Sequence, residues 1–198
     1  MKNTSLQLSV PEQTIVDELL RFFKKYNNQI RLFGLRRTHS HFHLETGELL
    51  IGRTDPTVRV LTISPCADDT VIATAAETAW TMINGQVAAS QYYCETDPEH
   101  NLIQRKTLTD FEKRVLSHAF VLLGDYAEIF EFFLVHEPLP LKRGEVLVEY
   151  NNPDTRVLTI KPMLPAQLIE MPVATAWRRG RESTILVNQF CYDEPHFS

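Results

Sequence analysis

Several common sequence features are scarce in this chain of 198 residues. It has seven glycines and no GxGxxG, Walker, GxSxG or HExxH motif, so no nucleotide-binding loop, hydrolase elbow or zinc-protease helix is indicated. Its three cysteines, Cys66, Cys94 and Cys191, show no CxxC spacing, which argues against a disulfide framework or a zinc ribbon. We therefore expect them to be small buried hydrophobic residues, and we expect no cofactor.

Basic charge and long apolar runs are also lacking. The formal net charge is -5 and the pI is about 5.8, whereas a general nucleic-acid binder needs a basic face. No apolar run reaches the roughly 18 residues of a membrane-spanning helix, and the first ten residues contain no apolar signal core. These features predict a cytoplasmic protein that binds neither nucleic acid nor membrane.

What the chain does contain is an internal repeat. Residues 47–65 read GELLIGRTDPTVRVLTISP, and residues 144–162 read GEVLVEYNNPDTRVLTIKP, an offset of 97. The match continues without a gap from 47–98 to 144–195, with sixteen identities in fifty-two pairs. A repeat of this kind predicts two copies of one supersecondary unit, related by a pseudo-twofold axis. We expect a single domain, 1–198, made of repeats 9–98 and 107–195.

Two matched pairs within the repeat carry their own predictions. Trp80 aligns with Trp177, which predicts two equivalent core anchors, and Cys94 aligns with Cys191.

Each repeat opens with a helix signal and continues into strands. Ser9 with Glu12, and Thr109 with Glu112, have the spacing of a capping box. Short helices are expected near 68–77 and 164–171. Strands are expected near 30–35, 57–64 and 86–95, and again near 129–135, 154–161 and 184–192. The unit is therefore α-β-β-α-β. Short links favour an α+β fold, with one antiparallel sheet of about six strands and helices on one face.

This order of elements, written twice, resembles the chorismate lyase-like superfamily, which includes chorismate lyases and the UTRA domains of bacterial regulators. The local likeness lies in residues 172–179 (PVATAWRR), the following strand 184–191, and Asp193-Glu194-Pro195. The resemblance implies a six-stranded antiparallel sheet with a pocket for small carboxylated, phosphorylated or aromatic molecules. The lyases release pyruvate from chorismate with an arginine on the first hairpin and a glutamate on the final strand. Thr81, and Asn188 or Gln189, stand near those two places.

The candidate ligand-binding residues are Arg178, Arg179, Arg59, Arg156 and Gln189. Strand alternation places Arg178 and Arg179 on opposite faces, so one of them could hold a carboxylate or phosphate in a pocket, and a solvated turn is the alternative. Arg59 and Arg156 recur at the same place in each repeat. They either pair with the equally repeated Glu48 and Glu145 or bind the ligand.

A histidine pattern is the weak candidate for a metal site. His39, His41 and His43 alternate with other residues, so in an extended segment their rings share one face, together with Glu45. A polar strand face or a loop is the simpler interpretation, and no metal is assigned.

The resulting hypothesis is a protein that binds a small anionic or aromatic ligand, such as an aromatic carboxylate. A divergent lyase of the chorismate type and an interaction module without a ligand are the alternatives, and a homodimer is left open.

Overall fold

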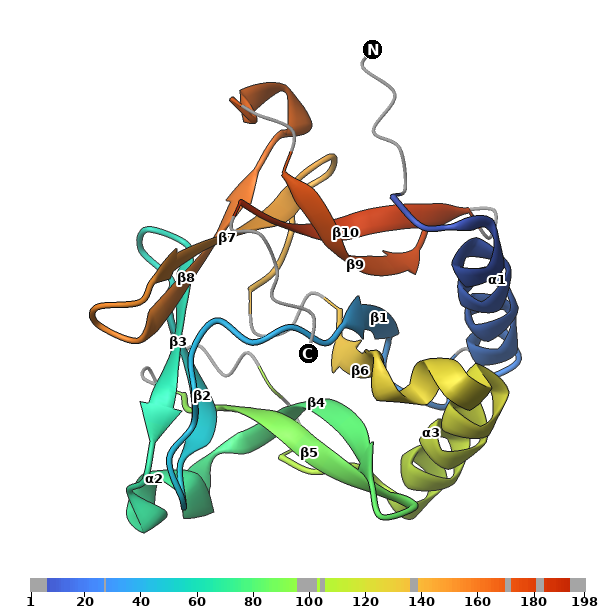
Figure 1. Cartoon of the computed structure of the whole chain (residues 1–198), viewed down its shortest axis with the longest axis horizontal. Helices are drawn as coiled ribbons and strands as arrows, with labels where there is room; N and C mark the ends of the chain where they lie inside the picture. The colour runs from blue at the N-terminus through green and yellow to red at the C-terminus, as the bar shows by residue number, and fades with distance from the viewer. Residues whose placement is uncertain are drawn as a thin grey trace.

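The fold is a closed β-barrel. The computed structural model describes residues 7–26, 28–95, 103, 106–135, 139–169, 172–180 and 184–192. The barrel strands follow the order β1-β6-β4-β5-β2-β3-β8-β7-β10-β9, and β9 pairs with β1 to complete the ring (Figure 1). The predicted α+β architecture, one antiparallel sheet of about six strands with helices on one face, is therefore wrong. The barrel is mixed, because β2 runs parallel to β5 and β7 runs parallel to β10.

The two repeats contribute corresponding elements to the barrel. The first supplies α1 (Val10–Lys24), β1 (Phe33–Arg37), β2 (Leu49–Asp55), β3 (Val60–Cys66), α2 (Asp69–Thr74), β4 (Ala76–Ile83) and β5 (Gln86–Tyr93). The second supplies α3 (Asp110–Leu123), η1 (Gly124–Glu128), β6 (Phe130–Leu134), β7 (Val146–Asn152), β8 (Val157–Met163), η2 (Pro165–Gln167), β9 (Val173–Arg179) and β10 (Ile185–Cys191). The 3-10 turn η2 takes the place of the second short helix.

The predicted α-β-β-α-β unit missed two strands in each repeat. In the first repeat these are β2 and β4. Gly52 interrupts the apolar pattern of β2, and the parallel partner of β2, β5, lies far along the chain. Strand β4 was not predicted, although Trp80 lies within it and faces Ala89 of β5. Both missed strands also form a hairpin with the next strand in the chain, β2 with β3 and β4 with β5. The strand count was too low because only the second strand of each hairpin was predicted.

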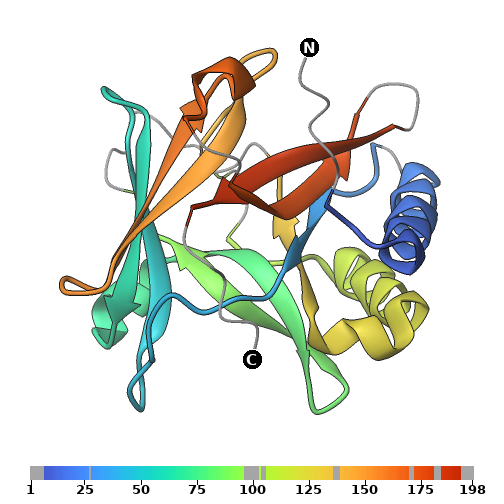
Figure 2. The ribbon, with the colours of Figure 1, turned by 45° about the horizontal axis from the view of Figure 1, so that its top comes forward.

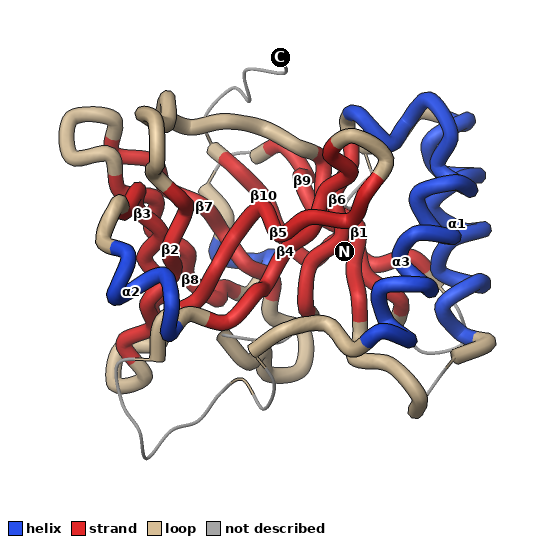
Figure 3. Tube along the Cα trace, turned by 90° about the horizontal axis from the view of Figure 1, so that it is seen from below, coloured by secondary structure: helices blue, strands red, loops and turns tan. Residues whose placement is uncertain are grey.

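The two long helices, α1 and α3, cover one side of the barrel (Figures 1 and 3). The capping boxes at Ser9 and Thr109 are confirmed, with each side chain accepting from a backbone N–H three residues later. Helices α1 and α3 lie side by side outside β1 and β6, while α2 lies at the opposite end of the molecule (Figures 1 and 3). The largest apolar core fills the space between these two helices and the barrel. No helix among the described residues is long and apolar enough to cross a membrane.

The pseudo-twofold axis is confirmed by strand registers. In the antiparallel pair β1–β6, Leu35 lies opposite Phe132, and in the pair β3–β8, Thr62 lies opposite Thr159. Both pairs join residues 97 apart, so each residue faces its own equivalent. A twofold axis must pass through both contacts (Figure 2 shows the two halves of the ring).

One part of the predicted alignment is wrong. Trp80 faces Ala89 and Trp177 faces Val187, so β5 and β10 correspond at an offset of 98 rather than 97. The last hairpin of the second repeat is one residue longer. Gln91 is therefore the structural equivalent of Gln189, and the match of Cys94 with Cys191 is not a structural one.

The first strands of the two repeats are exchanged. Among the described strands, β1 pairs with β6 and β9, both of the second repeat. In turn, β6 pairs with β1 and β4, both of the first. Each repeat thus inserts its first strand into the sheet of the other, as in an intramolecular domain swap.

The two tryptophans are equivalent core anchors, as predicted. Trp80 and Trp177 are 1% and 0% exposed and belong to the core beneath the helices. An arginine stacks on each ring: Arg31, two residues before β1, lies 5.6 Å from the Trp80 ring, and Arg37, the last residue of β1, lies 5.7 Å from the Trp177 ring. Arg31 also bonds to Glu112, and Arg37 bonds to Glu12. Each capping glutamate is thereby joined to the core.

We expect Trp80→Ala and Trp177→Ala each to reduce the free energy of unfolding by about 3–5 kcal/mol, the usual cost of truncating a buried aromatic ring. Val121→Ala, at a side chain exposed on α3, is the control and should change stability by less than about 0.5 kcal/mol. Urea denaturation measures all three. A loss below about 1 kcal/mol for either tryptophan would contradict its role as an anchor.

Candidate functional site in the barrel lumen

The inside of the barrel, which we call the lumen, carries charged side chains. On β1, Phe33 and Leu35 pack toward the helices, so strand alternation turns Arg36 inward. On β6, Phe130 and Phe132 pack toward the helices, and Glu131 turns inward. Arg36 shares one narrow space with residues of β3, β8 and β10, which places it inside the ring. Buried charges of this kind require partners with defined geometry.

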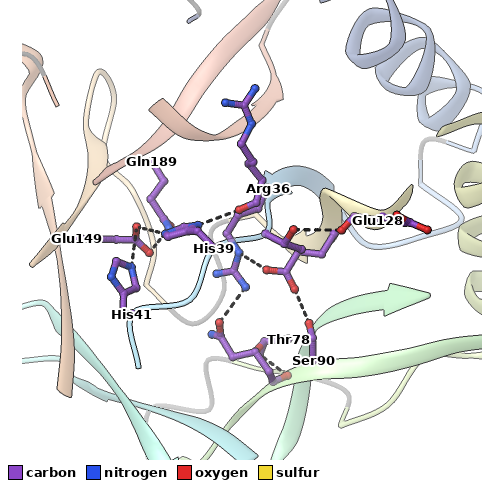
Figure 4. A network of polar contacts seen from close by, with 12 residues as sticks. Arg36, His39, His41, Thr78, Ser90, Glu128, Glu149 and Gln189 are labelled. Carbon is purple, nitrogen blue, oxygen red and sulfur yellow. Dashed lines mark hydrogen bonds and ion pairs between the residues drawn. The ribbon is translucent and has the colours of Figure 1, made fainter. Parts of the chain in front are cut away.

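Glu131 is held by a complete set of partners. Arg36 donates from Nε to Glu131 Oε1 at 2.7 Å, and Ser90 donates from Oγ to Oε2 at 2.5 Å. The same guanidinium donates to Gln91 Oε1 at 3.0 Å. The side chains of Arg36 and Glu131 are each 11% exposed. This is a buried, charge-balanced pair that fixes the guanidinium in the lumen (Figure 4).

A second buried carboxylate, Glu149 of β7, has a different environment. Its Oε2 lies 2.9 Å from His39 Nε2 and 3.6 Å from His41 Nε2, and its Oε1 accepts from Gln189 Nε2 at 2.7 Å (Figure 4). The Cys191 thiol lies 3.9 Å from His41 Nε2. Among the described residues, the charge partners of Glu149 are these two histidines, and no lysine or arginine pairs with it.

The orientation of His39 is fixed by hydrogen bonding. Its Nδ1 lies 2.9 Å from the Arg37 carbonyl oxygen, which can only accept, so Nδ1 carries the hydrogen and Nε2 faces Glu149. Burial alone would lower the pKa of His39, but the hydrogen bond and the charge of Glu149 outweigh it and raise that pKa. Burial alone would raise the pKa of Glu149, but the two histidines lower it well below its usual range.

A cavity of about 220 Å³ opens beside these groups. The segment from Thr38 to Gly47 crosses the barrel from β1 to β2 and supplies part of its wall (Figure 1). The side chains around this lumen cavity divide into polar and apolar sets. The polar set is Arg36, Thr38, His39, Ser40, His41, Ser90, Gln91, Glu131 and Glu149, and the apolar set is Phe42, Leu44, Leu50, Ile63 and Leu158.

The site breaks the internal symmetry. Glu131 and Glu149 of the second repeat occupy the places of Gly34 and Gly52 in the first. A Cβ atom at Gly34 would lie 2.5 Å from the Phe133 ring, so this glycine makes room for that ring. The barrel therefore forms without a carboxylate at either place in the first repeat. The two glutamates are present for a reason other than closing the sheet.

The structure brings together two of the three predicted histidines. His39 and His41 meet at Glu149, with their ring centroids 4.7 Å apart. His43 takes no part in this cluster, and its carbonyl oxygen accepts from Arg156. Glu45, predicted on the same face, is exposed in the turn before β2.

The repeated arginines form the predicted ion pairs, but across the repeats. Arg59 binds Glu145 through both terminal nitrogens, at 2.8 and 2.7 Å, and Arg156 binds Glu48 at 3.0 and 2.6 Å. Both arginines lie in turns at positive φ, not within strands as expected. These ion pairs lie outside the lumen cavity and link the two halves.

The remaining predicted residues lie in different places. Gln189 is in the lumen, bonded to Glu149. Arg179 lies on the helix side with Asn28 and Arg31, and alternation places Arg178 on the other face of β9. Burial lowers the pKa of Arg178. Neither arginine belongs to the set that lines the lumen cavity, and their role in ligand binding stays a prediction.

Sequence reasoning missed Arg36, Glu131 and Glu149. A signal was available for the two glutamates, since each is a charged residue in an apolar strand at a place where the first repeat has glycine. Of the three cysteines expected to be buried, Cys191 is fully buried, whereas Cys66 and Cys94 are only half-buried, so the prediction is wrong for those two. The Cys191 thiol also lies against His41. No sequence pattern linked Cys191 to His41, because the two residues are 150 positions apart.

Comparison of the chain with protein-family models, with curated proteins and with solved structures finds no match. The closed barrel also differs from the six-stranded antiparallel sheet that the resemblance to the chorismate lyase-like superfamily implies.

The contributions of Arg36 and Glu131 to the free energy of unfolding should be strongly coupled. Arg36→Met leaves a buried carboxylate without its charge partner and should cost about 3–5 kcal/mol of unfolding free energy. Glu131→Gln should cost a similar amount, and the double variant should cost clearly less than the sum. Urea denaturation of the four proteins gives the coupling energy. Additive effects would contradict a direct pair.

The Arg59–Glu145 pair should make stability depend on pH. The hydrogen bonds from Arg59 lower the pKa of Glu145 to about 2, against about 4.3 for an unpaired glutamate. The pair therefore stabilises the fold above the unfolded pKa, and this contribution is lost as the pH falls toward 2.

We expect Arg59→Met to flatten the fall in urea midpoint between about pH 5 and pH 2. Arg143→Met, which removes the same charge from an exposed neighbouring position, is the control and should leave the native slope. An unchanged slope in Arg59→Met would show that the pair contributes nothing to acid stability.

Proposed function

We propose that this protein binds, in its lumen cavity, a small molecule with an apolar body and a carboxylate-like end. We also propose that the protein is cytoplasmic. The observation that carries the proposal is the division of the cavity wall. One side is apolar, through residues such as Phe42, Leu50 and Ile63, and the other side carries buried, hydrogen-bonded charges. Pockets that combine an apolar lining with a few convergent polar groups are typical ligand sites.

The size of the cavity limits the ligand. At about 220 Å³ it is smaller than the roughly 300–1,000 Å³ of pockets for drug-sized ligands. A single-ring aromatic acid or a short aliphatic acid suits it better than a nucleotide or a larger cofactor.

One cationic group on the polar side is held in advance. Glu131 and Gln91 fix the guanidinium of Arg36 by accepting from Nε and from one terminal nitrogen. An incoming carboxylate would meet a donor group whose position is already set, which lowers the entropic cost of binding. Asn188 adds support: its buried amide has no hydrogen-bond partner among the described residues, and it lines a narrow space of about 30 Å³ that Arg36 also lines. A buried amide of this kind calls for a partner.

The state of the three cysteines supports the proposed cytoplasmic location. Cys66, Cys94 and Cys191 are all free thiols, which suits a reducing environment.

A larger groove of about 580 Å³ lies between α1 and α3, lined by Phe22, Val121 and Leu122 among others. Its charged residues, such as Glu18 and Lys25, do not form a buried hydrogen-bonded set comparable to that in the lumen. The lumen cavity is therefore the better candidate.

The test is a thermal-shift panel of small acids and their neutral amides, such as benzoate with benzamide. A ligand at a hundred times its dissociation constant adds about 2.7 kcal/mol, which corresponds to roughly 5–10 °C in Tm for a chain of this size. Leu44→Trp should fill the cavity mouth and abolish the shift. Leu164→Trp, at a similarly exposed leucine away from the cavity, should keep it.

A shift with acids but not with amides supports the proposal. If no acid shifts the native chain, or if Leu44→Trp responds like the native chain, the cavity is not the site. The interaction module without a ligand would then be the better hypothesis. The lyase alternative has no observation of its own in its favour, and release of pyruvate from a bound acid would be needed to revive it.

A further inference from the structure

The four groups around Glu149 have the arrangement of a metal site. One ligand atom each from His39, His41, Glu149 and Cys191 lies within 4.8 Å of the other three. The separations are 2.9 Å for His39–Glu149, 3.6 Å for His41–Glu149 and 3.9 Å for Cys191–His41. Bonds of about 2.0–2.3 Å to zinc place tetrahedral ligand atoms roughly 3.3–3.6 Å apart. These three separations lie within about 0.4 Å of the tetrahedral values, and the remaining ones, which are at most 4.8 Å, would shorten as the side chains close on the ion.

We propose that His39, His41, Glu149 and Cys191 bind one divalent transition-metal ion, with zinc as the preferred ion. Two imidazole nitrogens, one carboxylate oxygen and one thiolate form a donor set that suits zinc and does not suit magnesium or calcium, which take oxygen ligands. The carboxylate and the thiolate together balance the two positive charges. A neutral centre is the arrangement that a buried site requires, and Glu149 and Cys191 are 1% and 0% exposed.

The surrounding hydrogen bonds already orient the ligands. The Arg37 carbonyl accepts from His39 Nδ1 and leaves Nε2 directed at the site. Gln189 donates to Glu149 Oε1 and leaves Oε2 directed at the histidines. Outer partners of this kind fix the tautomer and the rotation of metal ligands in known sites.

A buried ion pair alone explains less of the geometry. A charged His39 would satisfy Glu149 without further help. It would not require His41 to lie 3.6 Å from the same oxygen or the Cys191 thiol to lie against His41. Four ligands of three types, from three separate parts of the chain, converge on one point.

The symmetry argument applies to these ligands as well. The structural equivalents of Glu149 and Cys191 in the first repeat are Gly52 and Tyr93, neither of which would replace the lost ligand. In the sequence, His41 aligns with Pro138 of the second repeat. His39 aligns with His136 and is the exception. The barrel closes without equivalents of the other three ligands in its other half, so the fold alone does not demand those three.

With four protein ligands the site is of the closed, structural type. It would fasten the segment between β1 and β2, from the first repeat, to β7 and β10 of the second. The lumen cavity, which His39 and His41 line, provides the path by which an ion enters. The inference goes beyond the proposed binding of an organic acid and does not depend on it.

The experiment is a cobalt and zinc titration of the full chain, after dialysis against a chelator and a reductant. We expect one Co²⁺ per chain, with a thiolate-to-cobalt charge-transfer band and the absorption of tetrahedral cobalt, and displacement of Co²⁺ by one equivalent of Zn²⁺. Tm should rise with bound zinc. Failure of the native chain to bind Co²⁺ or Zn²⁺ stoichiometrically would overturn the proposal without any variant.

Two matched pairs of variants locate the site. Cys191→Ser should abolish the charge-transfer band, and Cys94→Ser should keep it. Gln189→Leu should weaken zinc binding about 10–100-fold by releasing Glu149, whereas Gln91→Leu, at the structurally equivalent place, should leave it unchanged. A band that survives Cys191→Ser, or a loss that is equal in Gln189→Leu and Gln91→Leu, would place the ion elsewhere. The titration contains no organic acid, so its failure and the failure of the thermal-shift panel are separate results.

Discussion

The structure depends on the exchange of the first strands. Strand β1 finds both of its hydrogen-bonding neighbours, β6 and β9, in the second repeat, and β6 finds both of its neighbours in the first. The core beneath α1 and α3 forms on the outer face of this β1–β6 pair, so it exists only when both repeats are present. The ion pairs Arg59–Glu145 and Arg156–Glu48 reach across the repeats in the same way. Sheet, core and surface pairs therefore assemble together.

Against this symmetric frame, the lumen is asymmetric. Residues that support the fold come in equivalent pairs, such as Trp80 with Trp177 and Arg59 with Arg156. The charged residues in the lumen do not come in equivalent pairs, because each buried glutamate of the second repeat aligns with a glycine of the first. A buried carboxylate without adequate partners destabilises a protein by several kcal/mol. A carboxylate that is buried in just one of the two repeats therefore indicates a position where a requirement other than folding selects the residue. Both proposals rest on this separation of roles.

The sequence predicted the features that depend on local or repeated signals. The capping boxes at Ser9 and Thr109, the burial of the tryptophans, the twofold relation and the Arg–Glu pairs all follow from short spacings or from the repeat itself. The closed barrel did not follow, because the parallel pairing of β2 with β5 joins distant segments without a local signature. The alternation of His39 and His41 pointed to a shared face, but Glu149 and Cys191 reach that face only through the ring of strands.

The covalent joining of the two repeats has a consequence for what the lumen can contain. On either side of the axis between β1 and β6 lie the cross-strand pairs Arg36–Glu131 and Gly34–Phe133, which would be identical in a symmetric assembly. Two copies of the first repeat would place arginine beside glycine twice, and two copies of the second would place glutamate beside phenylalanine twice. Neither assembly could form the ion pair. Once both halves belong to one polypeptide, a residue can change without a change at the equivalent position of the other repeat. A single chain can therefore hold one pair of opposite charges, whereas a homodimer would have to hold the same pair twice.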